Sequence, residues 1–434
     1  MSKWASEHRR LKYAVEGCFN GVWGDEPNGV DDLVVVRVAD FNRERATVEL
    51  GDSPTIRAIP SGARNRRLLR KGDLLIEKSG GGEQQPVGNV VLFQHEVPAV
   101  CSNFVARLPV ADGCDPRYVA YLFRALYTEG KNVPHIKQTS GIQNLDSESY
   151  LNELAWLPSR DTQAAIANFL DQQTAGIDAL IAEKKRLVER LQELKRAQLG
   201  QLAVGLDSGR PLKETGHPAL PLIPRSWTLS RLKWVCSLLR DGTHQPPPRV
   251  DEGVPLLSVR NVQEGNFTFL PDDSFISEEH FLELNRSFDV RQGDVLLAVV
   301  GATMGKVAVV PAMGRTFHIQ RSLAVARPRL DLTMSELLAA QMRSEYFQQL
   351  LWQNTGFSAQ PGIYLGALGD FPIPIPPEEE RGQIVAALSE RASKVDTLVH
   401  HVRGHLHRLT EYRSSLISAA VTGQLNISEY KEAA

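Results

Sequence analysis

The sequence predicts a mixed α/β protein of the α+β type, in which two globular modules are joined by two long antiparallel coiled-coil helices. Two observations predict this pseudo-two-fold internal repeat. A helical pattern with an apolar stripe runs from Pro158 to Gly205, and the same pattern returns from Pro376 to Gly423. The segments that precede the two stripes also share an order of strand and turn motifs.

The first helical stretch has the composition of a coiled coil. From Asp161 to Leu199 the only Gly or Pro is Gly176. Apolar residues follow steps of three, four or seven residues, which predicts a seam formed by Ile177, Leu180, Leu187, Leu191 and Leu194, with Ile181, Val188 and Leu202 beside it. Such a stripe needs a partner to cover it, and the second copy is the most available partner.

The two helices match without a gap. A shift of 218 residues takes Pro158 to Pro376, Asp178 to Asp396 and Leu191 to Leu409. The preceding segments match at Arg10-Leu11 with Arg231-Leu232, Val36-Arg37 with Val259-Arg260, Gly72-Asp73 with Gly293-Asp294, and Ala106-Arg107 with Ala326-Arg327. The predicted organisation is module one at 1–157, helix one at 158–206, a Gly/Pro-rich linker at 207–224, module two at 225–375, helix two at 376–425 and a tail at 426–434.

Composition limits the classes of function. A length of 434 residues allows several cores, and a net charge of −2 is not that of a protein that coats nucleic acid without specificity. A local patch is nevertheless basic, since residues 57–71 hold six Arg or Lys and no acid. No apolar run approaches a membrane span and the N-terminus has no signal-peptide core, so we expect no membrane partner and a cytoplasmic location. The four scattered cysteines indicate neither a disulfide framework nor a zinc site.

No catalytic constellation is evident, and we expect no catalytic residue and no metal site. Gly301 to Val307 is similar to a phosphate-binding loop but is one residue short, and Val307 stands where Ser or Thr would hold magnesium. Asp115-Pro116 is typical of a helix start rather than of a methyltransferase site. His400, His401, His405 and His407 leave metal binding open as an alternative, with His405 at a seam position and the others in solvent.

The repeated layout and several of its motifs are similar to those of a known family. Two half-chain repeats, each a globular module followed by a long helix, resemble the specificity subunits of type I restriction-modification systems. The resemblance is strongest in the second half, at Asp241-Gly242-Thr243-His244, Pro255 to Val262, Gln292 to Leu296, Gly301 to Val310 and Ile373 to Glu380. The first module departs from it, because its equivalent of Asp241 to His244 reads Asn20-Gly21-Val22-Trp23.

The resemblance implies a non-enzymatic DNA reader. Each module would be a target-recognition domain for one half of a bipartite duplex target, and the helices would set the spacing and dock two methyltransferase subunits. Cofactors would belong to the partners: S-adenosylmethionine to the methyltransferase, and ATP with Mg to a restriction subunit where one joins. Two other functions remain open from the residues: a protein-binding scaffold and a fused methyltransferase. The absence of methyltransferase motifs opposes the second.

Specific reading needs side chains that reach base edges, while phosphate contacts supply register. The candidate DNA-binding residues are Arg37, Arg64, Arg66, Arg67, Arg70 and Lys78 in module one, and Thr243, His244, Gln245, Arg260, Asn261, Gln320, Arg321 and Gln360 in module two. A structural or solvated role is the alternative for each. The candidate docking face on the first helix consists of Lys184, Lys185, Arg186, Arg190, Lys195 and Arg196, with a merely solvated face as its alternative.

Overall fold

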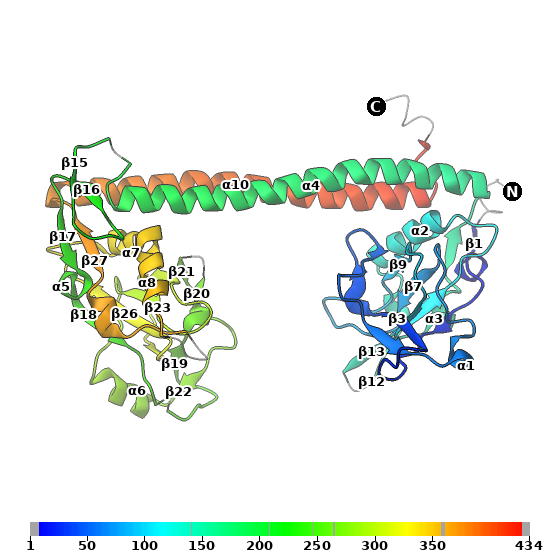
Figure 1. The fold of residues 1–434 in the computed structure, drawn as a ribbon, viewed down its shortest axis with the longest axis horizontal. Coiled ribbons are helices and arrows are strands. Elements are labelled where there is room, and N and C mark those ends of the chain that lie inside the picture. Colours follow the sequence, from blue (N-terminus) through cyan, green and yellow to red (C-terminus); the bar gives the residue numbers. More distant parts are fainter. Residues whose placement is uncertain are drawn as a thin grey trace. The chain divides into compact units, whose positions relative to one another are not determined.

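The structure is a computed structural model that describes residues 8–139, 141–207, 209–245, 247–263, 265–356 and 361–427. It divides into two compact units. Unit 1 comprises the chain up to Lys185 together with the part that follows from Gly404, and unit 2 comprises Arg186–Arg403. Each unit therefore holds one globular module and part of each long helix (Figure 1).

Unit 1 is built on a six-stranded sheet and a three-stranded sheet. The six-stranded sheet has the order β2 (Phe19–Asn20), β11 (Val105–Leu108), β7 (Leu74–Glu77), β9 (Val90–Leu92), β5 (Thr47–Val48) and β4 (Phe41–Asn42). The three-stranded sheet has β10 (Ala99–Cys101), β3 (Asp32–Val36) and β6 (Ile56–Ala58), with β10 parallel to β3. Two smaller sheets consist of β12 (Ile136–Thr139), β13 (Ile142–Leu145) and β8 (Ser79–Gly80), and of β1 (His8–Arg10) and β14 (Leu154–Trp156).

The helices of unit 1 connect this sheet structure to the long helices. They are α1 (Ser61–Arg64), α2 (Pro116–Thr128), α3 (Ser147–Tyr150) and the first part of α4 (Arg160–Ala203), with 3-10 turns at Leu11–Tyr13, Val38–Asp40 and Val133–His135. As predicted, Asp115 caps α2, because its side chain accepts the backbone N–H of Arg117, and Pro116 takes the first helical position.

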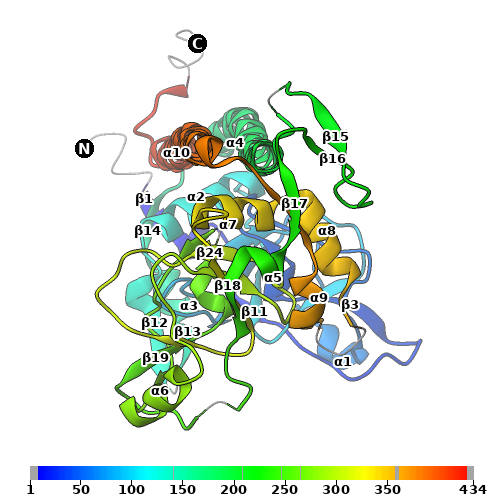
Figure 2. The ribbon, with the colours of Figure 1, turned by 90° about the vertical axis from the view of Figure 1, so that its left-hand side faces the viewer.

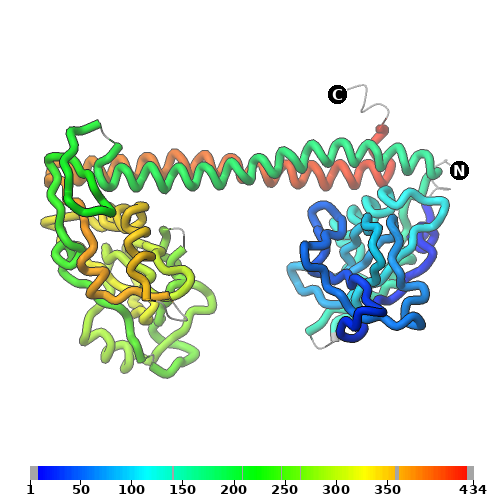
Figure 3. The backbone as a smooth tube through the Cα atoms, in the orientation of Figure 1, coloured from blue at the N-terminus to red at the C-terminus, as the bar shows by residue number. Residues whose placement is uncertain are grey.

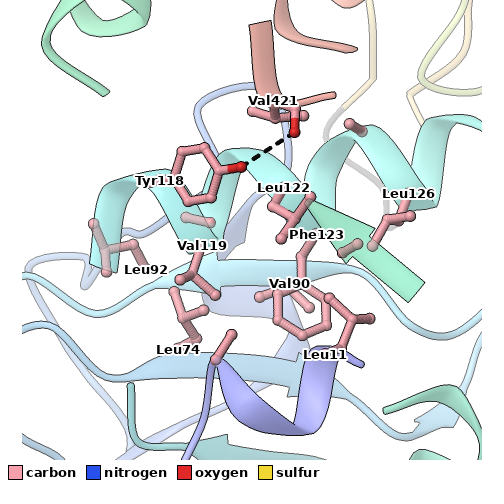
Figure 4. Packing of buried hydrophobic residues seen from close by; sticks show 14 of the residues in the cluster. Leu11, Leu74, Val90, Leu92, Tyr118, Val119, Leu122, Phe123, Leu126 and Val421 are labelled. Atoms are coloured by element: carbon pink, nitrogen blue, oxygen red, sulfur yellow. Dashed lines mark hydrogen bonds between the residues drawn. The ribbon is translucent and has the colours of Figure 1, made fainter. Parts of the chain in front are cut away.

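One face of α2 packs on the sheet and the other on the long helices. Val119, Phe123 and Leu126 meet Leu74 and Val90 in the core drawn in Figure 4. The Tyr118 hydroxyl donates to the carbonyl oxygens of Trp156 and Val421, at 2.7 and 3.1 Å. Val421 is the last residue of α10 (Glu378–Val421), whose red C-terminal part lies against unit 1 in Figure 3. Tyr118 therefore satisfies a carbonyl that the end of the helix leaves without an intrahelical partner.

Unit 2 repeats this plan. Its strands are β15 (Leu212–Glu214), β16 (Leu222–Pro224), β17 (Thr228–Arg231), β18 (Cys236–Asp241), β19 (Val254–Leu257), β20 (Val262–Gln263), β21 (Asn266–Phe267), β22 (Phe275–Ile276), β23 (Val295–Ala298), β24 (Val307–Val309), β25 (His318–Ile319), β26 (Leu323–Pro328) and β27 (Pro372–Ile375). Its helices are α5 (Leu232–Val235), α6 (Glu278–Asn285), α7 (Ser335–Arg343), α8 (Glu345–Gln353), α9 (Leu365–Gly369) and the first part of α10, with a 3-10 turn at Val259–Asn261. Figure 2 views this unit with the ends of the long helices facing the reader.

The sheet orders of the two units correspond. The set β2-β11-β7-β9 matches β18-β26-β23-β24, and β10-β3-β6 matches β25-β19-β22, including one parallel pair in each. The β1–β14 pair matches β17–β27. In unit 2 the Gln341 amide donates to the carbonyls of Ala203, at the end of α4, and of Pro374, so it does what Tyr118 does in unit 1. The internal repeat predicted from the sequence is therefore also a repeat of topology.

Two of the sequence matches are wrong by two residues. Both Arg37 and Ser258 begin a 3-10 turn with a capping box, so Arg37 corresponds to Ser258 rather than to Arg260. The ladder places Ala106 opposite Asn20 and Ala324 opposite Asp241, so Ala106 corresponds to Ala324 rather than to Ala326. Arg107 and Arg327 nevertheless do the same work, because each forms a bidentate ion pair with the aspartate of a Gly-Asp turn, Asp73 or Asp294.

The seam between the long helices differs from the predicted one. Buried and half-buried positions alternate in steps of four and three along α4, at Ile177, Ile181, Lys184, Val188, Leu191, Lys195, Gln198 and Leu202. The same shift of 218 gives the buried row of α10, from Val395 through Arg413 to Ala420. Leu180, Leu187 and Leu194 are instead 46%, 38% and 48% exposed. Lysine and glutamine occupy three of the seam positions, and for this reason the sequence pattern pointed to the more apolar neighbouring row.

Two ion pairs fix the antiparallel register of the helices. In unit 1, Arg413 donates to both carboxylate oxygens of Asp178 at 2.7 and 2.9 Å. In unit 2, Lys195 lies 2.6 Å from Asp396. The shift of 218 residues converts Asp178 into Asp396 and Lys195 into Arg413, so the two pairs are one contact made twice. Such reciprocal contacts are the signature of a two-fold interface.

None of the helices in the described ranges combines the length and the apolar character needed to cross a bilayer. The cysteines are unpaired, and burial raises the pKa of the Cys101 and Cys236 thiols to about 12, which makes them poor nucleophiles at neutral pH.

The two ion pairs should differ in their contribution to stability. Arg413 is 5% exposed, so Asp178→Ala leaves a buried charge without its partner, which should cost about 2–4 kcal/mol of unfolding free energy, discounted for the exposed part of Asp178. The matched control Asp396→Ala breaks a solvated pair and should cost less than about 1 kcal/mol. Urea unfolding of both variants measures the difference, and equal losses would contradict this account.

Candidate nucleic-acid interface

A close backbone approach shapes the candidate site of module two. A Cβ atom on Gly242 would lie 2.2 and 2.4 Å from the carbonyl oxygens of Ile319 and Gln320, so only glycine fits there. Thr243 then bridges to Gln320, and the Arg321 N–H donates to the Thr243 carbonyl at 3.1 Å. The structure thus brings the predicted loop and the predicted turn residues Gln320 and Arg321 together.

The side chains of this loop divide into anchors and exposed groups. The Thr243 hydroxyl donates to the Gln245 carbonyl at 2.8 Å, and His244 Nε2 lies 2.7 Å from Asp241. The half-buried Gln320 amide donates to the Leu256 carbonyl at 3.3 Å, which ties it to β19. Gln245 and Arg321 are exposed, and within the described residues neither side chain forms a hydrogen bond or an ion pair. The loop is therefore held in place while Gln245 and Arg321 stay available to a ligand.

Asn261 must be removed from the candidates. It is 1% exposed, its Oδ1 accepts the Ser258 N–H, and its amide donates to Asp273 at 2.8 and 3.0 Å. Its role is to close the 3-10 turn after β19, and a side chain enclosed in this way cannot meet a base edge. Arg260 is exposed but forms an ion pair with Asp272 at 2.7 Å. Gln360 lies outside the described residues.

Module one forms the same turn with different side chains. A Cβ atom on Gly21 would lie 2.1 Å from the carbonyl oxygens of Cys101 and Ser102, and the Val22 N–H donates to the Cys101 carbonyl, as the Thr243 N–H does to that of Ile319. Asn20-Gly21 is therefore the counterpart of Asp241-Gly242, as expected from the sequence. Asn20 was not among the candidate residues predicted from the sequence. The Asn-Gly dipeptide at the position of Asp241-Gly242 could have identified it.

Basic groups gather around Asn20. The Lys78 ammonium donates to Asn20 Oδ1 at 2.7 Å, and Arg67 Nε donates to the Asn20 carbonyl at 3.1 Å. The Arg66 guanidinium lies 5.9 Å from the Phe19 ring, and its exposed side chain has no acidic partner among the described residues. Arg107 donates to the Arg66 carbonyl and so links this loop to the buried Asp73 ion pair. We refer to Asn20, Arg66, Arg67 and Lys78 as the Asn20 cluster.

The remaining basic candidates of module one differ in availability. Arg64 is half-buried and holds its own loop through Asp31 and the Ile59 carbonyl. Arg37 hydrogen-bonds Asp40, which raises the pKa of its guanidinium and commits it to the capping box. Arg70 is exposed with no ion pair in the described ranges. The structure therefore separates two scaffold residues, Arg37 and Arg64, from the exposed Arg66 and Arg70.

The residues of the predicted docking face on α4 differ in how accessible they are. Lys184 and Lys195 belong to the seam, and Lys185 forms an ion pair with Glu44 at 3.0 Å. Arg186, Arg190 and Arg196 are exposed and lack ion pairs within the described part of the chain. No group of three His, Cys, Asp or Glu side chains able to hold a metal ion occurs among the described residues. His405 is exposed, which corrects its assignment to the seam.

Comparison with known proteins agrees with this picture. Residues 224–399 match the model of the type I restriction modification DNA specificity domain. The type I restriction enzyme EcoBI specificity subunit of Escherichia coli is 28% identical over 342 residues, which cover 76% of this chain and 70% of that protein. The chain is similar to type I restriction enzyme specificity subunits, and its second half matches their DNA specificity domain.

Further relatives extend the match over both halves. The MjaVIII specificity subunit of Methanocaldococcus jannaschii is 22% identical over 311 residues, covering 71% of this chain and 70% of that one. A solved chain from work on complex assembly and conformational transition of the type I R-M system has a TM-score of 0.69 at 18% identity, and the match covers 98% of this chain and all of the solved one. This chain therefore shares its fold with that solved chain over nearly its whole length.

The buried position of Asn261 leads to a prediction. Asn261→Ala should lower the unfolding free energy by about 1.5–3 kcal/mol, because Asp273 loses the amide that solvates its carboxylate inside the module. The neighbouring control Arg260→Ala should lower the urea midpoint less than Asn261→Ala, because its close ion pair with Asp272 is exposed to solvent and its contact with Asp273 is longer, at 3.9 Å. A folded and equally stable Asn261→Ala protein with an altered DNA preference would contradict this assignment.

Proposed function

We propose that this chain is the DNA-reading subunit of a type I restriction-modification complex, and that it catalyses no reaction itself. The observation that carries the proposal is the duplicated site. Gly21 and Gly242 create the same backbone turn in the two modules, and different polar side chains surround it in each. A duplicated scaffold with two different surfaces suits a bipartite duplex DNA target whose halves differ in sequence.

The two surfaces suit different parts of the duplex. In module two, the exposed Gln245 and Arg321 offer donors and acceptors of the kind that meet base edges, with Arg favouring guanine and Gln favouring adenine. In module one, the exposed Arg66 and Arg70 and the neighbouring Lys78 supply positive charge for phosphates. Phosphate contacts fix the register of a protein on DNA, while base contacts select the sequence.

The helices would set the distance between the half-sites. Helix α4 runs without a break for 44 residues, which corresponds to about 66 Å at about 1.5 Å per residue. That length is on the order of 19 base pairs at about 3.4 Å per step. We therefore expect the number of unread base pairs between the half-sites to follow the length of α4 and α10.

The same helices would dock two methyltransferase subunits. Leu180, Leu187 and Leu194 form an exposed row on α4, and the shift of 218 places the exposed Leu398 and Tyr412 on α10. Exposed apolar rows of this kind mark surfaces that meet another protein, and Arg186, Arg190 and Arg196 add charge on α4. Each methyltransferase would bring S-adenosylmethionine, and a restriction subunit would bring ATP and Mg.

The proposal predicts salt-dependent and sequence-dependent DNA binding. The complex of this chain with its methyltransferase should bind random duplex weakly, and more weakly still as salt rises, because phosphate contacts release counterions. Arg321→Ala should relax one half-site by about 1–3 kcal/mol per lost base contact and leave the other half-site unchanged.

Two controls accompany this titration. Arg329 is an exposed arginine that follows β26, whereas Arg321 precedes that strand, so Arg329→Ala should leave binding unaltered. The chain alone, incubated with S-adenosylmethionine and DNA, should transfer no methyl group. The absence of salt-dependent DNA binding would favour a protein-binding scaffold instead, and methylation by the chain alone would favour an enzyme.

A further inference from the structure

Module one carries a β-hairpin that the candidate residues did not include. Strands β12 and β13 pair antiparallel, with Lys137 opposite Asn144 and Gln138 opposite Gln143, and β13 also pairs with β8. In Figure 1 this hairpin lies at the end of unit 1 opposite to α4. Because side chains alternate along a strand, Gln143 and Leu145 share one face of β13, while Ile142 and Asn144 share the other.

The inner face anchors the hairpin to the module. Gln143 and Leu145 are buried, and Gln143 Oε1 accepts the Val87 N–H at 3.2 Å. The Leu145 N–H donates to the Lys78 carbonyl at 2.8 Å. These contacts hold the backbone of β13 in one position, so the side chains of the outer face are presented by a rigid element.

The outer face combines an amide with an apolar group. Ser79 donates its hydroxyl hydrogen to Asn144 Oδ1 at 2.6 Å, which orients the amide, and no acceptor in the described residues contacts the Asn144 side-chain nitrogen. Ile142 is 50% exposed although the hairpin around it is polar. The adjoining Lys78 belongs to the Asn20 cluster, and Phe104, also exposed, accepts the Lys78 and Ser79 N–H groups with its carbonyl oxygen.

We propose that module one reads part of its half-site through this outer face, with Asn144 hydrogen-bonding an adenine and Ile142 contacting the methyl group of a thymine. The inference rests on the proposed function. The major groove admits a two-stranded ribbon, and an amide for adenine and an apolar side chain for the thymine methyl are the matching chemistries. The positive charge of Lys78, Arg66 and Arg67 beside the hairpin complements the phosphates that border the groove.

The spacing of Ile142 and Asn144 on the strand predicts how far apart the two contacted base pairs lie. Ile142 and Asn144 are two residues apart on one face, which corresponds to about 7 Å along an antiparallel strand. Base pairs rise by about 3.4 Å, so the two side chains address positions on the order of two steps apart. The preference should therefore fall on two A·T pairs in a single half-site.

Module two lacks this pair of groups. The bridge between Val300 and Gly362 corresponds to the pairing of Ser79 with Asn144, so glycine occupies the place of Asn144. A hydrogen atom in place of the amide removes both its donor and its acceptor. Substitution of Asn144 should for this reason alter only the half-site that module one reads.

The experiment selects bound duplexes from a randomised library with the intact complex. Asn144→Ala should lose roughly 5- to 150-fold discrimination at one base pair of one half-site, and Ile142→Ala should lose a smaller discrimination at a second base pair, with the other half-site and the salt slope unchanged. Asn144→Asp should shift the preferred base from adenine to cytosine, because a carboxylate accepts from the cytosine amino group. Leu154→Ala, which removes an exposed apolar side chain from β14, should change nothing.

The outcomes separate the hairpin from the proposed function. Unchanged preferences in all three hairpin variants, with wild-type affinity retained, would overturn the hairpin reading alone. A wild-type complex without salt-dependent, sequence-selective binding would overturn the proposed function instead. Circular dichroism of each variant identifies misfolding, and Asn144→Asp, which is nearly isosteric, keeps the test decisive if an alanine variant fails to fold.

Discussion

The antiparallel pairing of α4 with α10 is the constraint on which the rest of the molecule depends. Its register is fixed by a contact made twice, Asp178 with Arg413 and Lys195 with Asp396. Unit 1 takes the beginning of α4 and the end of α10, so a module and the terminus of the distant helix fold as one core. Tyr118 and Gln341 complete this arrangement, because each satisfies a carbonyl at the end of the incoming helix.

Within each module, the scaffold is repeated while the exposed surface is not. Gly21 and Gly242, with the ion pairs Asp73–Arg107 and Asp294–Arg327, reproduce the same turns in both halves. The exposed groups around these turns differ. Module one has the Asn20 cluster and the β12–β13 hairpin, and module two has the Thr243 to Gln245 loop and Arg321. A scaffold that tolerates such exchange is what a reader of varied sequences requires, since base contacts depend on side chains rather than on the turn.

Much of this architecture was accessible from the sequence, because the helices match over their whole length at a single shift. The strand matches were less exact, because turn lengths that differ between the halves change the shift between equivalent residues from 221 at Gly72 to 218 at Cys101. The seam was misassigned because lysines at 184 and 195 interrupt its apolar pattern. The burial of Asn261 and the hydrogen bonds that hold Arg37 and Arg64 depend on the folded structure. A local sequence pattern does not predict them.

The central claim is that paired helices of defined register determine the distance between two reading modules. Insertion of one heptad between Leu187 and Val188, together with one between Arg403 and Gly404, preserves the register because the two points are equivalent across the paired helices. Each heptad adds about 10 Å of helix, or about three base pairs. Sequencing of methylated sites in a host that carries the altered complex should show both half-sites unchanged and a longer gap between them. An unchanged gap with altered half-sites would contradict the account.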